Sequence, residues 1–147
     1  MKTDTKLIVS QGVTATSNTT STFVFDSAGA SRAVIDYWTT QGQEVTNAPA
    51  VLKVGSGTDT STFTYIDAFT AGTGFTATTV ATATTLTNVY RFDVDTRGLE
   101  RYIALQVTPA VGQGATVLTH TVACNLFRLN RDGSDATGQN VLQLVQG

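Results

Sequence analysis

The chain contains one histidine, His120, and one cysteine, Cys124, and these two residues are the first candidates for nucleophilic chemistry. A Ser–His–Asp site needs its histidine beside an activated serine, but the sequence has no Gly-x-Ser-x-Gly turn to present one. On a single strand, a spacing of four residues separates His120 from Cys124 by roughly 13 Å, which is too far for a Cys–His dyad. We therefore interpret His120 as structural and Cys124 as a small core residue, and we expect no catalytic residue and no enzyme activity.

Charged residues gather in one short segment. Six of the 20 charged residues lie between Arg91 and Arg101, although the whole chain has 147 residues. Asp93 and Asp95 share one face of an expected strand, a spacing that could suit the paired carboxylates of a glycoside hydrolase. Arg91 lies on the same face and Arg97 follows, so we favour a solvated face with salt bridges. Our candidates for subunit contacts, where charge pairs set the register of an interface, are Arg91, Asp93, Asp95, Arg97 and Arg101.

Other motifs that hold metals or cofactors are weak or absent in the sequence. Residues 130–135 read Asn-Arg-Asp-Gly-Ser-Asp, which is only part of a calcium loop because the remaining ligands and the closing Glu are missing. We interpret this stretch as an Asp-Gly turn. There is no phosphate-binding loop and no zinc-like Cys/His spacing, so we expect no metal and no cofactor. Tyr37 and Trp38 could stack on a sugar, but alternation along a strand places one ring in the core and one outside.

Composition limits the classes of protein that remain. Charged residues make up 14% of the chain, against about 25% in typical soluble proteins, while Thr alone accounts for 29 residues. The net charge of -2 includes no basic stripe, which argues against nucleic-acid binding. No apolar run approaches the ~18 residues of a membrane helix, and the first ten residues lack the apolar core of a secretory signal. With a single cysteine, we expect a protein made in the cytoplasm.

The pattern of residue types predicts strands throughout. Thr, Val, Ile and aromatic residues favour pleated sheets, and apolar residues alternate with polar ones from Tyr90 to Asp95 and from Tyr102 to Val107. We predict an antiparallel hairpin over 89–108 that turns at Gly98. The other expected strands cover 6–16, 22–26, 32–40, 50–54, 63–69, 84–89 and 115–129; the last is long enough to bend or carry a bulge. Gly-rich or polar breaks at 27–30, 55–57 and 111–114 separate them. We predict one all-β domain over 1–147, an antiparallel β-sandwich resembling a jelly roll.

Two long segments without charges could extend from such a body. Residues 68–90 and residues 7–25 carry no charged side chain and are rich in Thr. An uncharged edge is prone to aggregation unless a partner covers it. We therefore consider residues 1–20 and 68–90 as arms that lie across neighbouring subunits, with an ordinary internal strand pair as the alternative for residues 68–90.

The segment Val89–Pro109 resembles small structural proteins of tailed bacteriophages, with a strand that ends near Arg97-Gly98 and an Arg101-Tyr102 pair that opens the next. The remainder of the chain is similar in composition to capsid decoration, or cement, proteins. This resemblance implies a virion protein, a dimer or trimer, that binds the outside of an assembled capsid and clamps neighbouring major-capsid subunits. The alternative is a tail or head fibre component or a carbohydrate-binding β-sandwich module.

Overall fold

The computed structural model describes residues 3–15, 19–41, 49–77, 88–108 and 118–129. These residues form eight β-strands and no helix, so the described part of the chain contains no helical segment that could cross a membrane. The strands are β1 (Thr3–Ala15), β2 (Ser21–Asp26), β3 (Arg32–Gln41), β4 (Val51–Gly57), β5 (Thr64–Thr70), β6 (Asn88–Asp95), β7 (Tyr102–Thr108) and β8 (Leu118–Leu129). The prediction of an all-β fold is confirmed.

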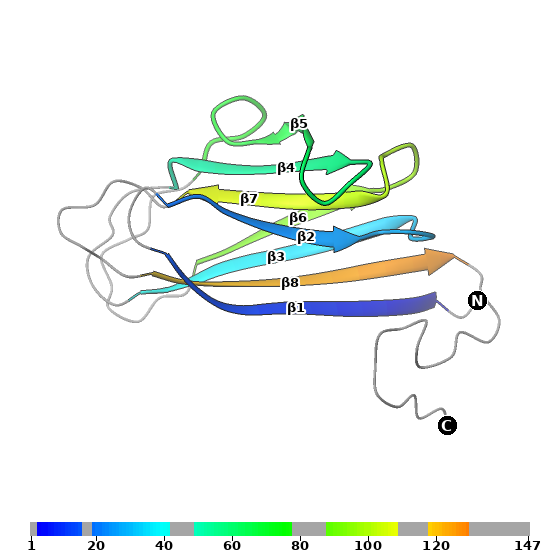
Figure 1. Cartoon of the computed structure of the whole chain (residues 1–147), viewed down its shortest axis with the longest axis horizontal. Helices are drawn as coiled ribbons and strands as arrows, with labels where there is room; N and C mark the ends of the chain where they lie inside the picture. The colour runs from blue at the N-terminus through cyan, green and yellow to red at the C-terminus, as the bar shows by residue number, and fades with distance from the viewer. Residues whose placement is uncertain (1–2, 16–18, 42–48, 78–87, 109–117, 130–147) are drawn as a thin grey trace, which may run out of the picture.

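The strands form two four-stranded antiparallel sheets (Figure 1). The first sheet has the order β1-β8-β3-β6, and the second sheet has the order β2-β7-β4-β5. Strand β1 pairs with β8, β2 with β7, β3 with β6, and β4 with β5. The chain is therefore arranged as one long hairpin that turns between β4 and β5. Its four successive strand pairs belong alternately to the first and to the second sheet.

Apolar side chains from both sheets meet between them in one core. Every second residue of a strand points inward, so Ile35 and Tyr37 of β3 and Leu105 of β7 are at most 1% exposed. The core consists of Phe23, Phe25, Ala33, Ile35, Tyr37, Leu52, Val54, Phe92, Val94, Ile103, Leu105, Val107, Val122, Cys124 and Leu126. Burial of each large apolar side chain contributes roughly 1.5–3 kcal/mol. This shared core confirms that the two sheets form an antiparallel β-sandwich.

The predicted hairpin over 89–108 is wrong. Strand β6 belongs to the first sheet, where it pairs with β3, whereas β7 lies in the second sheet between β2 and β4. The connection over 96–101 therefore crosses from one sheet to the other. A period of two identifies which face of a strand is apolar, but two strands that face each other across a core alternate in the same way as two strands side by side.

The predicted break at Gly55-Ser56-Gly57 is also wrong, because these residues form the second half of β4. The glycines are explained by the close approach of the neighbouring chain. A Cβ atom on Gly55 would lie 2.6 Å from the carbonyl oxygen of Thr64, and one on Gly57 would lie 2.0 Å from that of Thr62. Glycine in a strand permits such an approach, so these residues allow the pairing that a break would prevent.

Residues 3–15 form a strand, so the arm predicted over residues 1–20 is not observed in that part. Strand β1 pairs with β8 and forms one edge of the first sheet, and Ile8 packs against the core. The pairing is irregular between Ser10 and Val13, where β1 has one residue more than β8. Strand β8 itself pairs with β3 in continuous register. The bulge that we considered for 115–129 therefore lies in the partner strand.

The first part of the uncharged segment 68–90 packs on its own molecule. Phe69 and Phe75 contact the ring of Phe92 edge-on, with ring centroids 6.2 and 5.8 Å apart. A turn between them is closed by a hydrogen bond of 2.8 Å from the Gly72 amide to the Phe75 carbonyl. These aromatic rings link β5 and β6, the last strands of the two sheets. Residues 78–87 of the predicted arm lie outside the described residues, and residues 88–90 form the start of β6.

Candidate interaction surface

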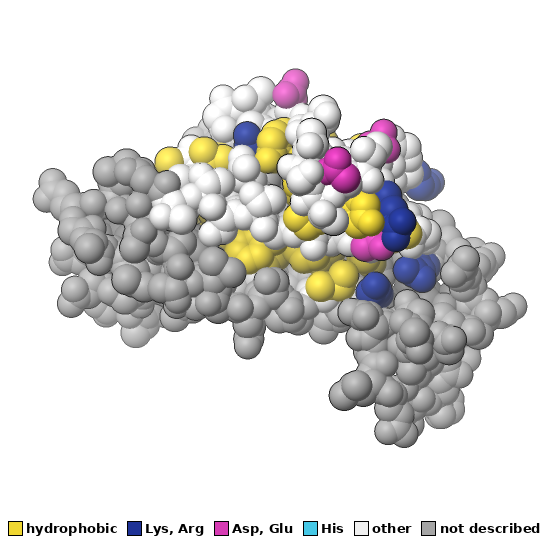
Figure 2. All heavy atoms as spheres, in the orientation of Figure 1, with side chains coloured by type: hydrophobic (Ala, Val, Ile, Leu, Met, Phe, Trp, Pro, Cys, Tyr) yellow, Lys and Arg dark blue, Asp and Glu magenta, His cyan; other side chains and the backbone are white. Residues whose placement is uncertain are grey.

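The five charged residues singled out from the sequence all lie on the surface, three of them on β6 and two in the connection that follows it. Arg91, Asp93 and Asp95 are exposed on the outer face of the first sheet, since Phe92 and Val94 between them point into the core. Arg97 lies in the connection to the second sheet, and Arg101 lies at its end. In Figure 2 most of the basic side chains gather toward the same end of the molecule.

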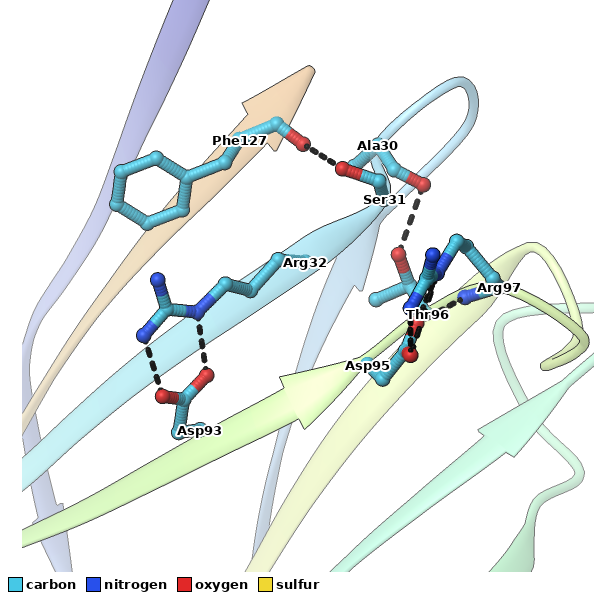
Figure 3. A network of polar contacts seen from close by, with 8 residues as sticks. All are labelled: Ala30, Ser31, Arg32, Asp93, Asp95, Thr96, Arg97 and Phe127. Atoms are coloured by element: carbon cyan, nitrogen blue, oxygen red, sulfur yellow. Dashed lines mark hydrogen bonds and ion pairs between the residues drawn. The ribbon is translucent and has the colours of Figure 1, made fainter. Parts of the chain in front are cut away.

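Each of these five side chains binds an oppositely charged partner within the chain. Arg91 donates two hydrogen bonds to Asp36 of β3, at 2.6 and 2.9 Å. Arg32 of β3 binds both carboxylate oxygens of Asp93 (Figure 3). The remaining pairs are Arg97 with Asp95, at 2.6 Å, and Arg101 with Asp26, at 2.8 Å. Exposed ion pairs contribute little to stability, so their main effect is to fix the positions of the charges.

These pairs keep the carboxylates ionised. The hydrogen bonds from Arg32 hold the pKa of Asp93 below its usual value, and those from Arg101 do the same for Asp26. The side chain and amide of Arg97 lower the pKa of Asp95 to about 2. A general acid at neutral pH needs a raised pKa. Asp93 and Asp95 are therefore unsuited to donate a proton there, and their arrangement favours the salt-bridged face over a glycosidase pair.

The connection over 96–101 is joined to the neighbouring connection between β2 and β3. The hydroxyl of the buried Thr96 donates to the carbonyl of Ala30 at 2.7 Å, and the Thr96 amide donates to Ser31 at 3.1 Å. Ser31 in turn donates to the Phe127 carbonyl of β8 (Figure 3). Gly98 has a φ of 86°, a conformation that favours glycine. The two connections between the sheets are thus hydrogen-bonded to each other at the end of the molecule where Arg97 and Arg101 lie, which we call the charged end.

Tyr37 and Trp38 do not form an aromatic platform. Tyr37 is 1% exposed and stacks on Tyr90, with ring centroids 6.1 Å apart. Burial raises the pKa of the Tyr37 hydroxyl well above its usual value. Trp38 is half-buried on the outer face of the first sheet, opposite Val89 in the register of β3 and β6. This agrees with the expectation of one ring inside and one outside. Val89 is 57% exposed, so Trp38 and Val89 give this face an apolar spot.

The outer face of the second sheet carries aromatic side chains that the sequence analysis missed. Tyr65 lies beside Gly55, since a Cβ there would be 2.9 Å from its ring, and Phe63 has the same relation to Gly57. The Lys53 ammonium lies 3.7 Å from the centroid of the Tyr65 ring. The signal was present as Gly55-x-Gly57 in β4 and as Phe63-x-Tyr65 across the start of β5. An aromatic ring can cover the space that a strand glycine leaves.

The other two candidates for chemistry, Cys124 and His120, both belong to β8. Cys124 is fully buried, and burial raises the pKa of its thiol to about 12, which makes it a poor nucleophile. His120 lies on β8, four residues before Cys124 on the same strand. Within the described residues, no three His, Cys, Asp or Glu side chains are grouped so as to hold a metal ion. The stretch 130–135 lies outside these residues.

Comparison with known proteins gives no family. No protein-family model matches the chain, and no curated protein matches it.

Proposed function

We propose that this protein is a structural virion protein that binds the outside of an assembled phage capsid and stabilises it by clamping neighbouring major-capsid subunits. The observation that carries the proposal is the strand order, 1-8-3-6 in one sheet and 2-7-4-5 in the other. This order supports a jelly roll, the doubled eight-stranded hairpin that occurs in viral capsid and lectin domains. The resemblance of residues 89–109 to phage structural proteins supports the same assignment.

The proposed mechanism is mass action. A protein that binds only the assembled shell stabilises that shell by its binding free energy at every site. A braced sandwich suits this role, because a body that is already rigid loses little conformational entropy when it binds. The two connections held together through Thr96 and Ser27 make the charged end rigid in this sense.

We place the capsid contact on the outer face of the first sheet. Trp38 and the exposed Val89 are neighbours there, and tryptophan is enriched among residues that dominate interface energies. The edge strand β1 is part of the sandwich, so the contact does not need an N-terminal arm over residues 3–15. The partner in this proposal is the major capsid protein, with no nucleic acid and no membrane.

The experiment is co-sedimentation of purified protein with preformed capsid shells that lack it. We expect saturable binding at a fixed ratio and a higher melting temperature of the loaded shells. The variant Trp38→Ala should weaken binding by about tenfold or more. Val24→Ala, a half-buried position on the second sheet, is the matched control and should bind as the natural chain does. Absence of saturable binding, or equal loss in both variants, would contradict the proposal.

A carbohydrate-binding module is the second candidate, and the aromatic rings on the second sheet favour it. Tyr65 and Tyr102 are half-buried on that outer face, each with a cation over its ring. The hydrogen bond between Tyr65 and Gln106 adds a polar group of the kind that orients a sugar. Here Tyr65→Ala, and not Trp38→Ala, should abolish binding on a glycan array.

A further inference from the structure

Strand β6 is the last strand of the first sheet. It is eight residues long and, among the described residues, pairs only with β3. The other edge of such a strand presents unpaired amide and carbonyl groups that can accept another strand. Charged side chains usually protect such an edge, and the outward side chains of Arg91, Asp93 and Asp95 are each more than half exposed. The order of these charges decides which strand can pair there.

The charges of β6 are complementary to themselves in one antiparallel register. The outward residues run Val89, Arg91, Asp93, Asp95, that is neutral, positive, negative, negative. When two copies of β6 pair about a two-fold axis at Phe92, Arg91 of each copy lies opposite Asp93 of the other. Directly opposite residues have Cβ atoms about 4.5–5.5 Å apart, and opposite charges there stabilise the pair.

Three neighbouring registers each place like charges opposite each other. An axis at Arg91 places two arginines opposite each other. An axis at Asp93 pairs Arg91 with Asp95 twice but places two aspartates opposite each other, so it still contains a like-charge pair that the axis at Phe92 lacks. An axis at Val94 places Asp93 opposite Asp95 twice. Like charges directly opposite are destabilising, so the sequence of β6 selects the axis at Phe92 among these four.

We propose that two copies of this protein associate through β6 about a two-fold axis at Phe92, so that their first sheets form one continuous sheet. The ion pairs within each copy extend across this interface. Arg91 is held by Asp36, and Asp93 is held by Arg32. In the dimer Asp36, Arg91, Asp93 of the partner subunit and Arg32 of the partner subunit form one row of alternating charge.

This dimer goes beyond the proposed function and does not rest on it, because it forms in the purified protein without a capsid. It also distinguishes between the dimer and trimer that the resemblance implies, since an isologous edge closes after two copies.

The test is analytical ultracentrifugation of the full chain over a concentration series. We expect the natural chain to dimerise. Arg91→Glu places a carboxylate opposite Asp93 twice, and Asp93→Arg places a guanidinium opposite Arg91 twice. Each variant should weaken dimerisation by about tenfold or more. The two variants mixed in equal amounts should form a heterodimer with nearly the natural affinity, because both contacts across the axis are then again between opposite charges.

Arg101→Glu is the matched control. It makes the same change of charge as Arg91→Glu and breaks a comparable exposed ion pair, the one between Arg101 and Asp26. Arg101 directly precedes β7 of the second sheet and does not belong to β6. It should dimerise as the natural chain does. Thermal unfolding of every variant establishes that the chain is folded. A monomeric or trimeric natural chain would overturn the proposal, as would an Arg91→Glu variant that dimerises normally or a mixture that fails to form the heterodimer.

Discussion

At the scale of single residues, glycine and aromatic side chains act together on the second sheet. Gly55 occupies a strand position where glycine is usually unfavourable, yet the space above it is taken by Tyr65 and the backbone of Thr64. The sequence alone indicated a break here, since glycine content was visible and the approach of β5 was not. The residues of a close approach can be recognised from sequence only when the opposing strand is known.

We predict that Gly55→Ala lowers the free energy of unfolding by about 1–3 kcal/mol, the usual cost of overpacking. The new Cβ would lie 2.6 Å from the Thr64 oxygen, a backbone atom that cannot rotate away. Urea denaturation of the variant measures the effect. Tyr65→Ala in the same chain is the control: it removes the ring but should not restore the stability lost at Gly55. Full restoration would contradict this explanation.

The aspartates with lowered pKa values predict a loss of stability in acid. A carboxyl whose pKa is lower in the folded chain stabilises the fold above its unfolded pKa of 3.8, and this contribution disappears as the pH falls through the folded pKa, about 2 for Asp95. The free energy of unfolding should therefore decrease between about pH 4 and pH 2. Asp95→Asn and Arg97→Gln should both make this decrease shallower. Equal pH profiles for the natural chain and both variants would rule out this pair as a cause.

At the scale of elements, the positions of the strands could be predicted and their neighbours could not. Alternation located β6 and β7 within one or two residues, because it reflects which side of each strand is buried. It could not distinguish a hairpin from a connection between sheets, since Phe92 and Leu105 face one core in either case. The residue that marks the connection is Thr96, a buried threonine directly after the exposed Asp95.

We predict that Thr96→Val destabilises the fold by about 1–2 kcal/mol, because it removes a buried hydrogen bond to the Ala30 carbonyl while keeping the shape of the side chain. Thr96→Ser keeps the hydroxyl and is the control for the change of volume. Thermal and urea unfolding compare the two variants. If valine were tolerated as well as serine, the bond between the two connections would not contribute to stability.

At the scale of the whole molecule, the charged residues form ion pairs on the protein surface, and the sequence indicated only part of this arrangement. The sequence predicted that these residues cluster on one exposed face and form salt bridges there, because alternation places Arg91, Asp93 and Asp95 on one side of β6. Their partners could not, since Asp36 and Arg32 lie more than fifty positions away in the chain. The sheet order creates these pairs and leaves β6 at an edge, where its charges can meet those of a second copy.

The central proposal, a protein of the capsid exterior, is tested most directly by the number of its copies in purified virus particles. Quantitative mass spectrometry would measure this number against the major capsid protein. The proposal predicts a ratio near a simple fraction of the capsid subunits, as expected for sites repeated over the shell. A few copies in each particle would indicate a tail or fibre component instead, and complete absence from particles would contradict a role in the virion.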